Sequence, residues 1–249
     1  MASRMSGVDG VLFLHAFPLD ARMWALQRAA LERQTKVVAV NLPGFGGTQA
    51  VGNVMSMGMA ADRAASAARR AGMRKALVCG LSMGGYVALA LWRQHPDLVG
   101  GLVLANTKAE ADDAAGQERR AQLAARLRAE GSGFLVENPP PLLSEQASPD
   151  LWKRVKDLIA AQPPNSIAAA SLGMAERPDS TSDLAAIKVP TLVISAEHDA
   201  VIPPAASQPL ADGIKGAKLE VISGAGHLSN LEAPEAFNKL LTGHLAKLK

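Results

Sequence analysis

The chain has 249 residues, of which 48% are hydrophobic and 20% are charged. At roughly 150 residues per domain, this length fits one domain with an insertion. The composition is that of a globular protein and argues against a collagen-like, coiled-coil or disordered chain. The net charge is only +3 and aromatic residues make up 4%. The basic residues are scattered, so the sequence does not predict a nucleic-acid-binding surface.

One cysteine, Cys79, is present, so the chain can form no internal disulfide. Residues 1–10 are polar, and the apolar run at residues 11–14 is too short for the core of a signal peptide or for a membrane span. We therefore expect a cytoplasmic protein that does not associate with a membrane. The sequence leaves open whether identical chains form a homo-oligomer.

Short apolar runs, rich in β-branched residues, recur along the chain and predict strands. Each run is continuous rather than alternating, which is typical of strands that are covered on both faces. Segments with helical spacing separate the runs, and this order predicts an α/β fold with a mostly parallel, doubly wound sheet. The expected strands are residues 11–14, 36–40, 75–79, 100–104, 191–195 and 219–222.

Four segments between or after these strands show helical spacing of apolar residues. Asp20 is a suitable N-cap for the first of them, and Pro96 prevents the third from continuing. The expected helices are residues 21–33, 56–70, 83–94 and 234–247.

Residues 107–188 contain no convincing strand and interrupt this order. A crossover between parallel strands needs only about a dozen residues, so we interpret the segment as an insertion. We expect an α/β core of residues 1–106 and 189–249 and a helical cap of residues 107–188 over the edge of the sheet. The helical patterns in the cap are residues 111–130, 149–161 and 165–175.

The segment Gly80-Leu81-Ser82-Met83-Gly84 follows a predicted strand and precedes a predicted helix, which is the setting of the nucleophile elbow G-x-S-x-G. The serine of such a turn is strained, and side chains two positions on either side would collide with the strand and the helix. The structural alternative is a turn of small residues that only packs the helix on the strand. No Gly-Lys-Ser/Thr follows, so the segment does not predict a phosphate loop.

A serine nucleophile needs a base that an acid holds in the correct tautomer. Of the five histidines, His227 follows a Gly-Ala-Gly turn after the last predicted strand, so its imidazole can reach the carboxyl edge of the sheet. Asp199 follows the preceding strand. The order Ser82, Asp199, His227 is the order expected for this elbow. Glu197 is a neighbouring alternative to Asp199.

Acyl transfer also needs two hydrogen-bond donors for the oxyanion. We expect these to be the backbone N–H of Met83, next to the serine, and the backbone N–H of Phe17, in the turn after the first predicted strand. His15 in the same turn is expected to fix this loop rather than to act as a second base.

The turn at residues 15–20, the elbow, the acid loop and the segment Asn41-Leu42-Pro43-Gly44-Phe45-Gly46-Gly47-Thr48 together resemble the α/β-hydrolase superfamily. The resemblance implies a serine-dependent hydrolase of esters, thioesters or lactones that has a variable cap and needs no cofactor or metal. Residues 226–237 resemble the tail of the 3-oxoadipate enol-lactonases and related esterases. Ala16 replaces a glycine usual in the family. The family's sheet normally begins with two further strands, but only ten residues precede the first predicted strand, so we expect a shortened sheet of six strands.

The leading hypothesis is a hydrolase of small carboxylic esters or lactones that forms an acyl-enzyme on Ser82. The same residues also fit a perhydrolase, as in cofactor-free haloperoxidases, or a carbon–carbon bond hydrolase. A receptor that binds a small molecule under the cap is the alternative from another class. The candidate substrate contacts, which can equally form the core of the cap, are Leu135, Leu142, Trp152 and Met174.

Overall fold

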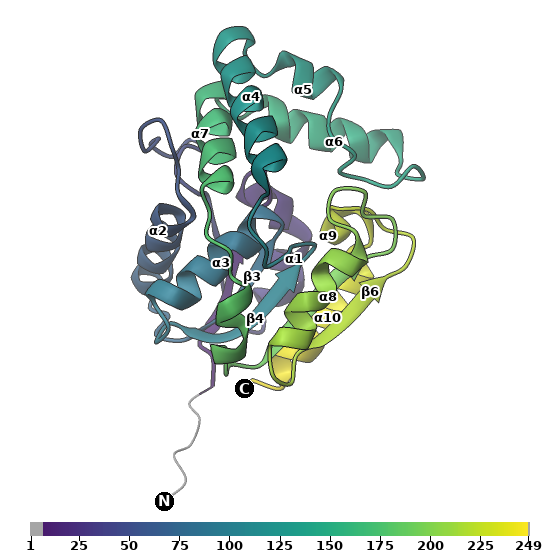
Figure 1. The fold of residues 1–249 in the computed structure, drawn as a ribbon. Coiled ribbons are helices and arrows are strands. Elements are labelled where there is room, and N and C mark those ends of the chain that lie inside the picture. The colour runs from purple at the N-terminus through teal and green to yellow at the C-terminus, as the bar shows by residue number, and fades with distance from the viewer. Residues whose placement is uncertain (1–6, 249) are drawn as a thin grey trace, which may run out of the picture.

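The computed structural model describes residues 7–248, so residues 1–6 of the polar N-terminal segment and residue 249 lie outside the described residues. Within this range the strands form one parallel sheet in the order β2-β1-β3-β4-β5-β6 (Figure 1). The predicted sheet of six parallel strands is confirmed. The strands are β1 (Gly10–Leu14), β2 (Lys36–Val40), β3 (Ala76–Leu81), β4 (Val99–Ala105), β5 (Thr191–Ala196) and β6 (Lys218–Ile222).

The position of each strand in the sheet explains its composition. Every residue of β1, β3 and β5 is buried, whereas the edge strands β2 and β6 are partly exposed. Inner strands of a parallel sheet have helices on both faces, so apolar residues follow one another without alternation.

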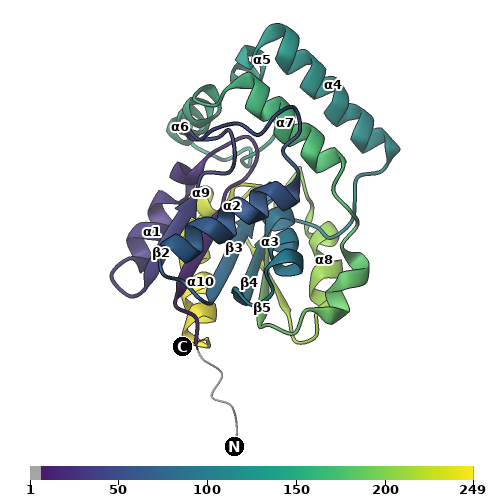
Figure 2. The ribbon, with the colours of Figure 1, turned by 90° about the vertical axis from the view of Figure 1, so that its left-hand side faces the viewer.

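Helices cover both faces of the sheet. On one face α2 (Met57–Arg70) packs against α3 (Met83–Gln94), and on the other α1 (Ala25–Leu31) packs against α10 (Pro234–Ala246) (Figure 2). The first predicted helix differs in one respect, because it begins as the 3₁₀ turn η1 (Ala21–Trp24). No helix within residues 7–248 combines the length and the apolar character that a membrane span requires.

Two helices of the core were not predicted from the sequence. The first, α8 (Pro204–Gly213), contains Pro209 and has few large apolar residues. The second, α9 (Ser229–Glu232), has only four residues. Helices this short or this weakly patterned give no clear periodic signal.

Four helices between β4 and β5 lie together beyond the carboxyl end of the sheet (Figure 1). The predicted helix at 111–130 begins three residues later, where Asp113 caps it by accepting a hydrogen bond from the backbone N–H of Gly116. After these helices, η2 (Thr181–Ala186) packs against α8. The division into a core and a cap at residues 107–188 stays a prediction. The four helices are α4 (Ala114–Glu130), α5 (Gly133–Glu137), α6 (Pro149–Ala160) and α7 (Pro164–Ala175).

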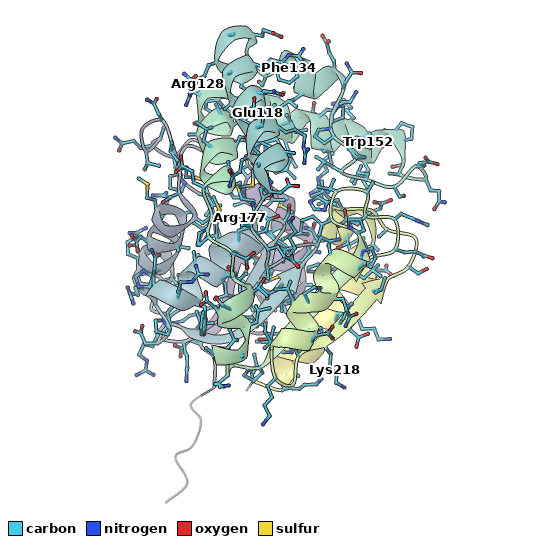
Figure 3. The ribbon with its side chains drawn as sticks, in the orientation of Figure 1. Glu118, Arg128, Phe134, Trp152, Arg177 and Lys218 are labelled. Atoms are coloured by element: carbon cyan, nitrogen blue, oxygen red, sulfur yellow. The ribbon has the colours of Figure 1, made fainter. Side chains whose placement is uncertain are left out.

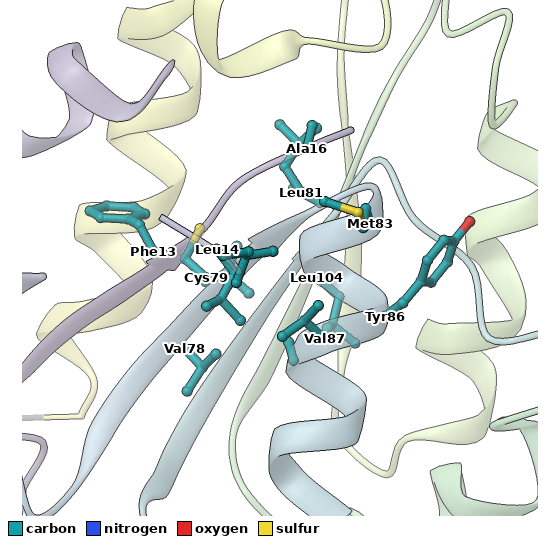
Figure 4. Packing of buried hydrophobic residues seen from close by; sticks show 14 of the residues in the cluster. Phe13, Leu14, Ala16, Val78, Cys79, Leu81, Met83, Tyr86, Val87 and Leu104 are labelled. Atoms are coloured by element: carbon teal, nitrogen blue, oxygen red, sulfur yellow. The ribbon is translucent and has the colours of Figure 1, made fainter. Parts of the chain in front are cut away.

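The hydrophobic core fills the spaces between the sheet and its helices. In Figure 4, Val87 of α3 lies beside Leu104 of β4, and both are fully buried. On the opposite face Trp24 stacks on Phe13 with ring centroids 4.6 Å apart and contacts Phe237 of α10 at 5.8 Å. This aromatic cluster joins the first turn of the chain to its last helix.

His15, directly after β1, ties the ends of two neighbouring strands together. Its Nδ1 donates a hydrogen bond to the Ala16 carbonyl at 3.0 Å, and its Nε2 accepts one from the Leu42 N–H at 3.1 Å. One donor and one acceptor describe a neutral imidazole. Burial lowers the pKa of His15 from 6.5 to about 4, which favours the expected structural role in this loop.

Replacing Phe237 by alanine is expected to lower the free energy of unfolding by about 3 to 5 kcal/mol, because it leaves a cavity beside Trp24. Chemical denaturation followed by Trp fluorescence measures this change. The control is Leu26→Ala, whose side chain is exposed and whose expected cost is within about 0.5 kcal/mol. Equal effects of the two substitutions would contradict the assignment of the cluster to the core.

His15 also predicts a pH dependence of stability. Below pH 6.5 the unfolded chain binds a proton on His15, whereas the folded chain keeps this imidazole neutral down to about pH 4. The unfolded state therefore gains protons first, and the free energy of unfolding falls as the pH falls. Between about pH 8 and about pH 5, the wild type should lose about 2 kcal/mol more than His15→Gln, which cannot titrate. Equal losses measured by denaturant unfolding would show that the folded imidazole protonates normally.

Candidate active site

Ser82 occupies a strained turn between β3 and α3. Its φ of 57° and ψ of −116° place it in the left-handed region that side chains rarely adopt. A Cβ on Gly80 would collide with the Gly84 carbonyl, and a Cβ on Gly84 would collide with the Leu14 carbonyl. The turn is held by hydrogen bonds of 2.9 Å from the Ser82 N–H to the Ala105 carbonyl and from Thr107 Oγ1 to the Ser82 carbonyl. The glycines therefore have the steric role that the sequence predicts.

His227 and Asp199 form a buried pair. His227 Nδ1 lies 2.9 Å from Asp199 Oδ2 and 3.0 Å from Oδ1. The side chains are 1% and 0% exposed, respectively. Asp199 Oδ1 also accepts hydrogen bonds from the backbone N–H groups of Val201 and Ile202, at 2.9 and 2.8 Å. A buried carboxylate needs such partners, and here they also fix its orientation toward the imidazole.

Asn106 completes the surroundings of the carboxylate and was missed by the sequence reasoning. Its Nδ2 donates to Asp199 Oδ2 at 2.9 Å, and its Oδ1 accepts from Ser229 Oγ at 2.6 Å. The residue is fully buried and has a φ of 46°. The sequence did offer one signal for this contact, which is a polar residue directly after β4. The carboxyl ends of parallel strands meet at one edge of the sheet, so such a residue can reach a side chain that follows β5.

Glu197, the alternative acid, has different partners. Its exposed side chain accepts hydrogen bonds from Ser223 Oγ at 2.5 Å and from the Gly224 N–H at 2.9 Å. These bonds order the turn that leads to His227. Among the other histidines, His95 pairs with Asp62 at 2.8 Å on the surface.

The two predicted oxyanion donors follow the ends of two neighbouring strands, β3 and β1. Met83 begins α3 directly after Ser82, and Phe17 lies in the turn between β1 and η1. Within residues 7–248 neither backbone N–H has a hydrogen-bond partner. The turn around Phe17 is held by a bond from the Leu19 N–H to the Ala16 carbonyl at 2.9 Å. Both N–H groups are therefore available to an incoming oxygen atom.

A cavity of about 630 Å³ brings Ser82, His227 and Phe17 to one surface. Of the predicted substrate contacts, Leu142 and Met174 line this cavity. Leu135 and Trp152 are not among its lining residues: Leu135 is buried in the hydrophobic core and Trp152 packs against that core. Within residues 7–248, no three His, Cys, Asp or Glu side chains are grouped closely enough to bind a metal ion.

Known proteins share this architecture. The sequence profile of the alpha/beta hydrolase family matches residues 11–240. A thermophilic esterase from Thermogutta terrifontis, solved with malate bound, has 39% identity and a TM-score of 0.92 over 96% of this chain and 90% of its own. The enol-lactonase from Burkholderia xenovorans LB400 has 27% identity and a TM-score of 0.88, covering 98% and 94%.

Relatives that are similar in sequence belong to the same group of proteins. The 3-oxoadipate enol-lactonase 1 of Acinetobacter baylyi is 27% identical over 243 residues, which cover 96% of this chain and 89% of the enol-lactonase. The match of the family profile spans nearly the whole chain, including the serine turn and the loop of His227. The chain belongs to the alpha/beta hydrolase family.

Proposed function

We propose that the chain is a serine hydrolase that cleaves small carboxylic esters or lactones through an acyl-enzyme on Ser82. The observation that carries the proposal is that Ser82 and His227 line one cavity. His227 is in turn paired with Asp199, which is buried behind it. The relatives that are named esterase and enol-lactonase support the same reaction class.

In the proposed reaction, His227 Nε2 takes the hydroxyl proton as Ser82 Oγ attacks the acyl carbon. The N–H groups of Phe17 and Met83 bind the oxyanion, and each such donor lowers the barrier by roughly 3 to 4 kcal/mol in comparable enzymes. His227 then returns the proton to the leaving oxygen. Water, deprotonated by His227, attacks the acyl-enzyme and releases the acid and free Ser82.

Asp199 has two tasks in this scheme. Its hydrogen bond to Nδ1 leaves Nε2 of His227 as the nitrogen that exchanges protons with Ser82, and its charge stabilises the imidazolium. Asn106 is a positioning residue, because it donates to the Asp199 oxygen that lies closer to the imidazole. These groups are buried, so water does not compete for their hydrogen bonds.

The segment of residues 114–175, helices and connecting loops together, supplies one wall of the cavity and, in the proposal, acts as the cap that selects the substrate. Leu142 and Met174 line the cavity from this side, and Leu123 of α4 joins them. Apolar walls around a few fixed polar groups are typical of small-molecule sites.

Replacing Ser82 by alanine is expected to abolish both hydrolysis of p-nitrophenyl acetate and labelling by a fluorophosphonate, because both need the serine oxygen. The matched control is Ser182→Ala in η2, an exposed serine, which should leave both rates unchanged. Undiminished turnover by Ser82→Ala would rule out the acyl-enzyme.

Replacing Asn106 by alanine is expected to lower kcat about tenfold, the scale of one hydrogen bond to a charged group. KM should change little, since Asn106 is not among the residues that line the cavity. Asn53→Ala, an exposed asparagine, serves as the control. Steady-state kinetics gives kcat and KM for each variant, and the thermal transition shows that each variant is folded. A rise in KM at constant kcat would contradict a positioning role.

A further inference from the structure

A second cavity, of about 320 Å³, lies beside the catalytic cavity of about 630 Å³. Within residues 7–248, Tyr86 is the one residue that lines both. Two pairs of consecutive residues divide between them. Lys108 and Met174 line the catalytic cavity, whereas Ala109 and Gly173 line the second. The two cavities are therefore neighbours, and the wall between them includes Tyr86.

The face of α3 that carries Tyr86 runs from one cavity to the other. Ser82, Tyr86 and Ala90 are spaced four residues apart, so they lie along one side of the helix. Ser82 and Tyr86 line the catalytic cavity, and Tyr86 and Ala90 line the second. In Figure 4 the ring of Tyr86 extends from α3 away from Phe13 and Cys79 of the sheet. A chain that runs from the serine along this face meets the ring before it reaches the second cavity.

The guanidinium group of Arg177 holds the ring of Tyr86 in place. Its Cζ lies 4.1 Å from the ring centroid, a distance at which a cation is attracted to the face of an aromatic ring. Arg177 is only 4% exposed and lies where α7 ends (Figure 3). It donates hydrogen bonds to the carbonyls of Met174 and Glu110 at 2.7 and 2.8 Å and to Asp112 Oδ1 at 2.9 Å. The ring therefore stacks on a group that is itself fixed.

The hydroxyl group of Tyr86 contributes nothing to this arrangement. Within the described part of the chain it has no hydrogen-bond partner. The side chain as a whole is only 6% exposed. The position of the residue thus depends on the packing of its ring, and the ring is what separates the two cavities.

The walls of the second cavity suit a hydrocarbon chain. Met57, Ala90 and Ala109 contribute apolar side chains to it. Arg93 also lines this cavity but already pairs with Asp183 at 2.7 Å, so its charge is balanced. Removal of methylene groups from water into such surroundings is favourable.

We propose that Tyr86 is a specificity-determining residue, whose ring closes the second cavity to the substrate and so limits the length of the acyl chain that Ser82 accepts. This inference rests on the proposed function of Ser82. A short acyl chain fits within the catalytic cavity, whereas a longer one meets the ring and leaves methylene groups in water. Removal of the ring joins the two cavities, and those methylene groups are then buried.

The acyl chain, rather than the leaving group, faces this wall. The leaving oxygen lies beside His227, which protonates it in the proposed reaction. His227 follows the edge strand β6, whereas the second cavity lies against α2 and α3, which pack on each other. The leaving group therefore occupies the side of His227, and the acyl chain extends along α3.

The test measures kcat/KM for p-nitrophenyl acetate, butyrate, hexanoate and octanoate. The readout is the ratio of octanoate to acetate, because the fraction of active enzyme cancels in it. Tyr86→Ala should raise this ratio about tenfold, the gain from burying about two further methylene groups. Tyr86→Phe keeps the ring and should keep the wild-type ratio. An unchanged ratio in Tyr86→Ala, or an equal rise in both variants, would overturn the role of the ring.

Ala90→Leu is the matched control from the far side of the wall. Ala90 lines the second cavity and not the catalytic one, so a larger side chain there fills space that the wild-type substrate does not reach. Alone, this substitution should leave the ratio unchanged. Combined with Tyr86→Ala, it should return the ratio toward the wild-type value, and a ratio that stays raised would overturn the proposal. If Tyr86→Ala does not fold, Tyr86→Leu allows the same comparison without the ring.

A series of alkyl acetates, from ethyl to octyl, tests the direction of the chain. Their relative values of kcat/KM should be the same in the wild type and in Tyr86→Ala, since the alcohol lies on the side of His227. A gain that is confined to this series would overturn the assignment of the wall to the acyl chain.

Two results separate this inference from the proposed function. If Ser82→Ala abolishes hydrolysis but Tyr86→Ala leaves the ratio of octanoate to acetate unchanged, the role of Tyr86 is overturned and the serine hydrolase stands. If the wild type cleaves no ester, calorimetric titration with 1-octanol and 1-butanol still tests the wall. A gain in octanol binding relative to butanol binding in Tyr86→Ala supports it, and an unchanged relative affinity overturns it.

Discussion

The close approach of α3 to the ends of β1 and β3 is the constraint on which the site depends. Gly80 and Gly84 have no side chain, and any Cβ there would meet backbone atoms. The helix can therefore begin directly at the strand end, and Ser82 is forced into a left-handed conformation. Such strain persists only where surrounding contacts over-determine it. Here those contacts are the hydrogen bonds of the Ser82 backbone to Ala105 and Thr107.

The segment between β4 and β5 that contains α4 to α7 is tied to the His227 loop and to the Phe17 turn. Glu232, five residues after His227, accepts hydrogen bonds from the backbone N–H groups of Gly226 at 2.9 Å and Ser144 at 3.1 Å. On the other side of the sheet end, Gln162 donates to Asp20 at 2.7 Å, at the end of the turn that contains Phe17. The wall of the cavity, the His227 loop and the Phe17 turn are thus held in one arrangement.

Local patterns predicted much of this protein. The apolar runs located all six strands, because inner strands of a parallel sheet are apolar on both faces. The Gly-x-Ser-x-Gly turn and the order of Ser82, Asp199 and His227 pointed to one edge of the sheet. The position of Asn106 directly after β4 indicates the edge of the sheet, but only the fold shows that its side chain lies 2.9 Å from Asp199, 93 positions later.

The sequence by itself determined the sheet, the serine turn and the family, because each depends on residues close together in the chain or on the order of elements. Only the tertiary structure decided which apolar residues between β4 and β5 face the cavity. Leu135 and Leu142 are both apolar and buried, yet only Leu142 lines it. Likewise, only the fold showed that Asp112 pairs with both Arg120 and Arg177, which lie far apart in the chain. The physical reason is that burial and charge pairing depend on contacts between distant segments.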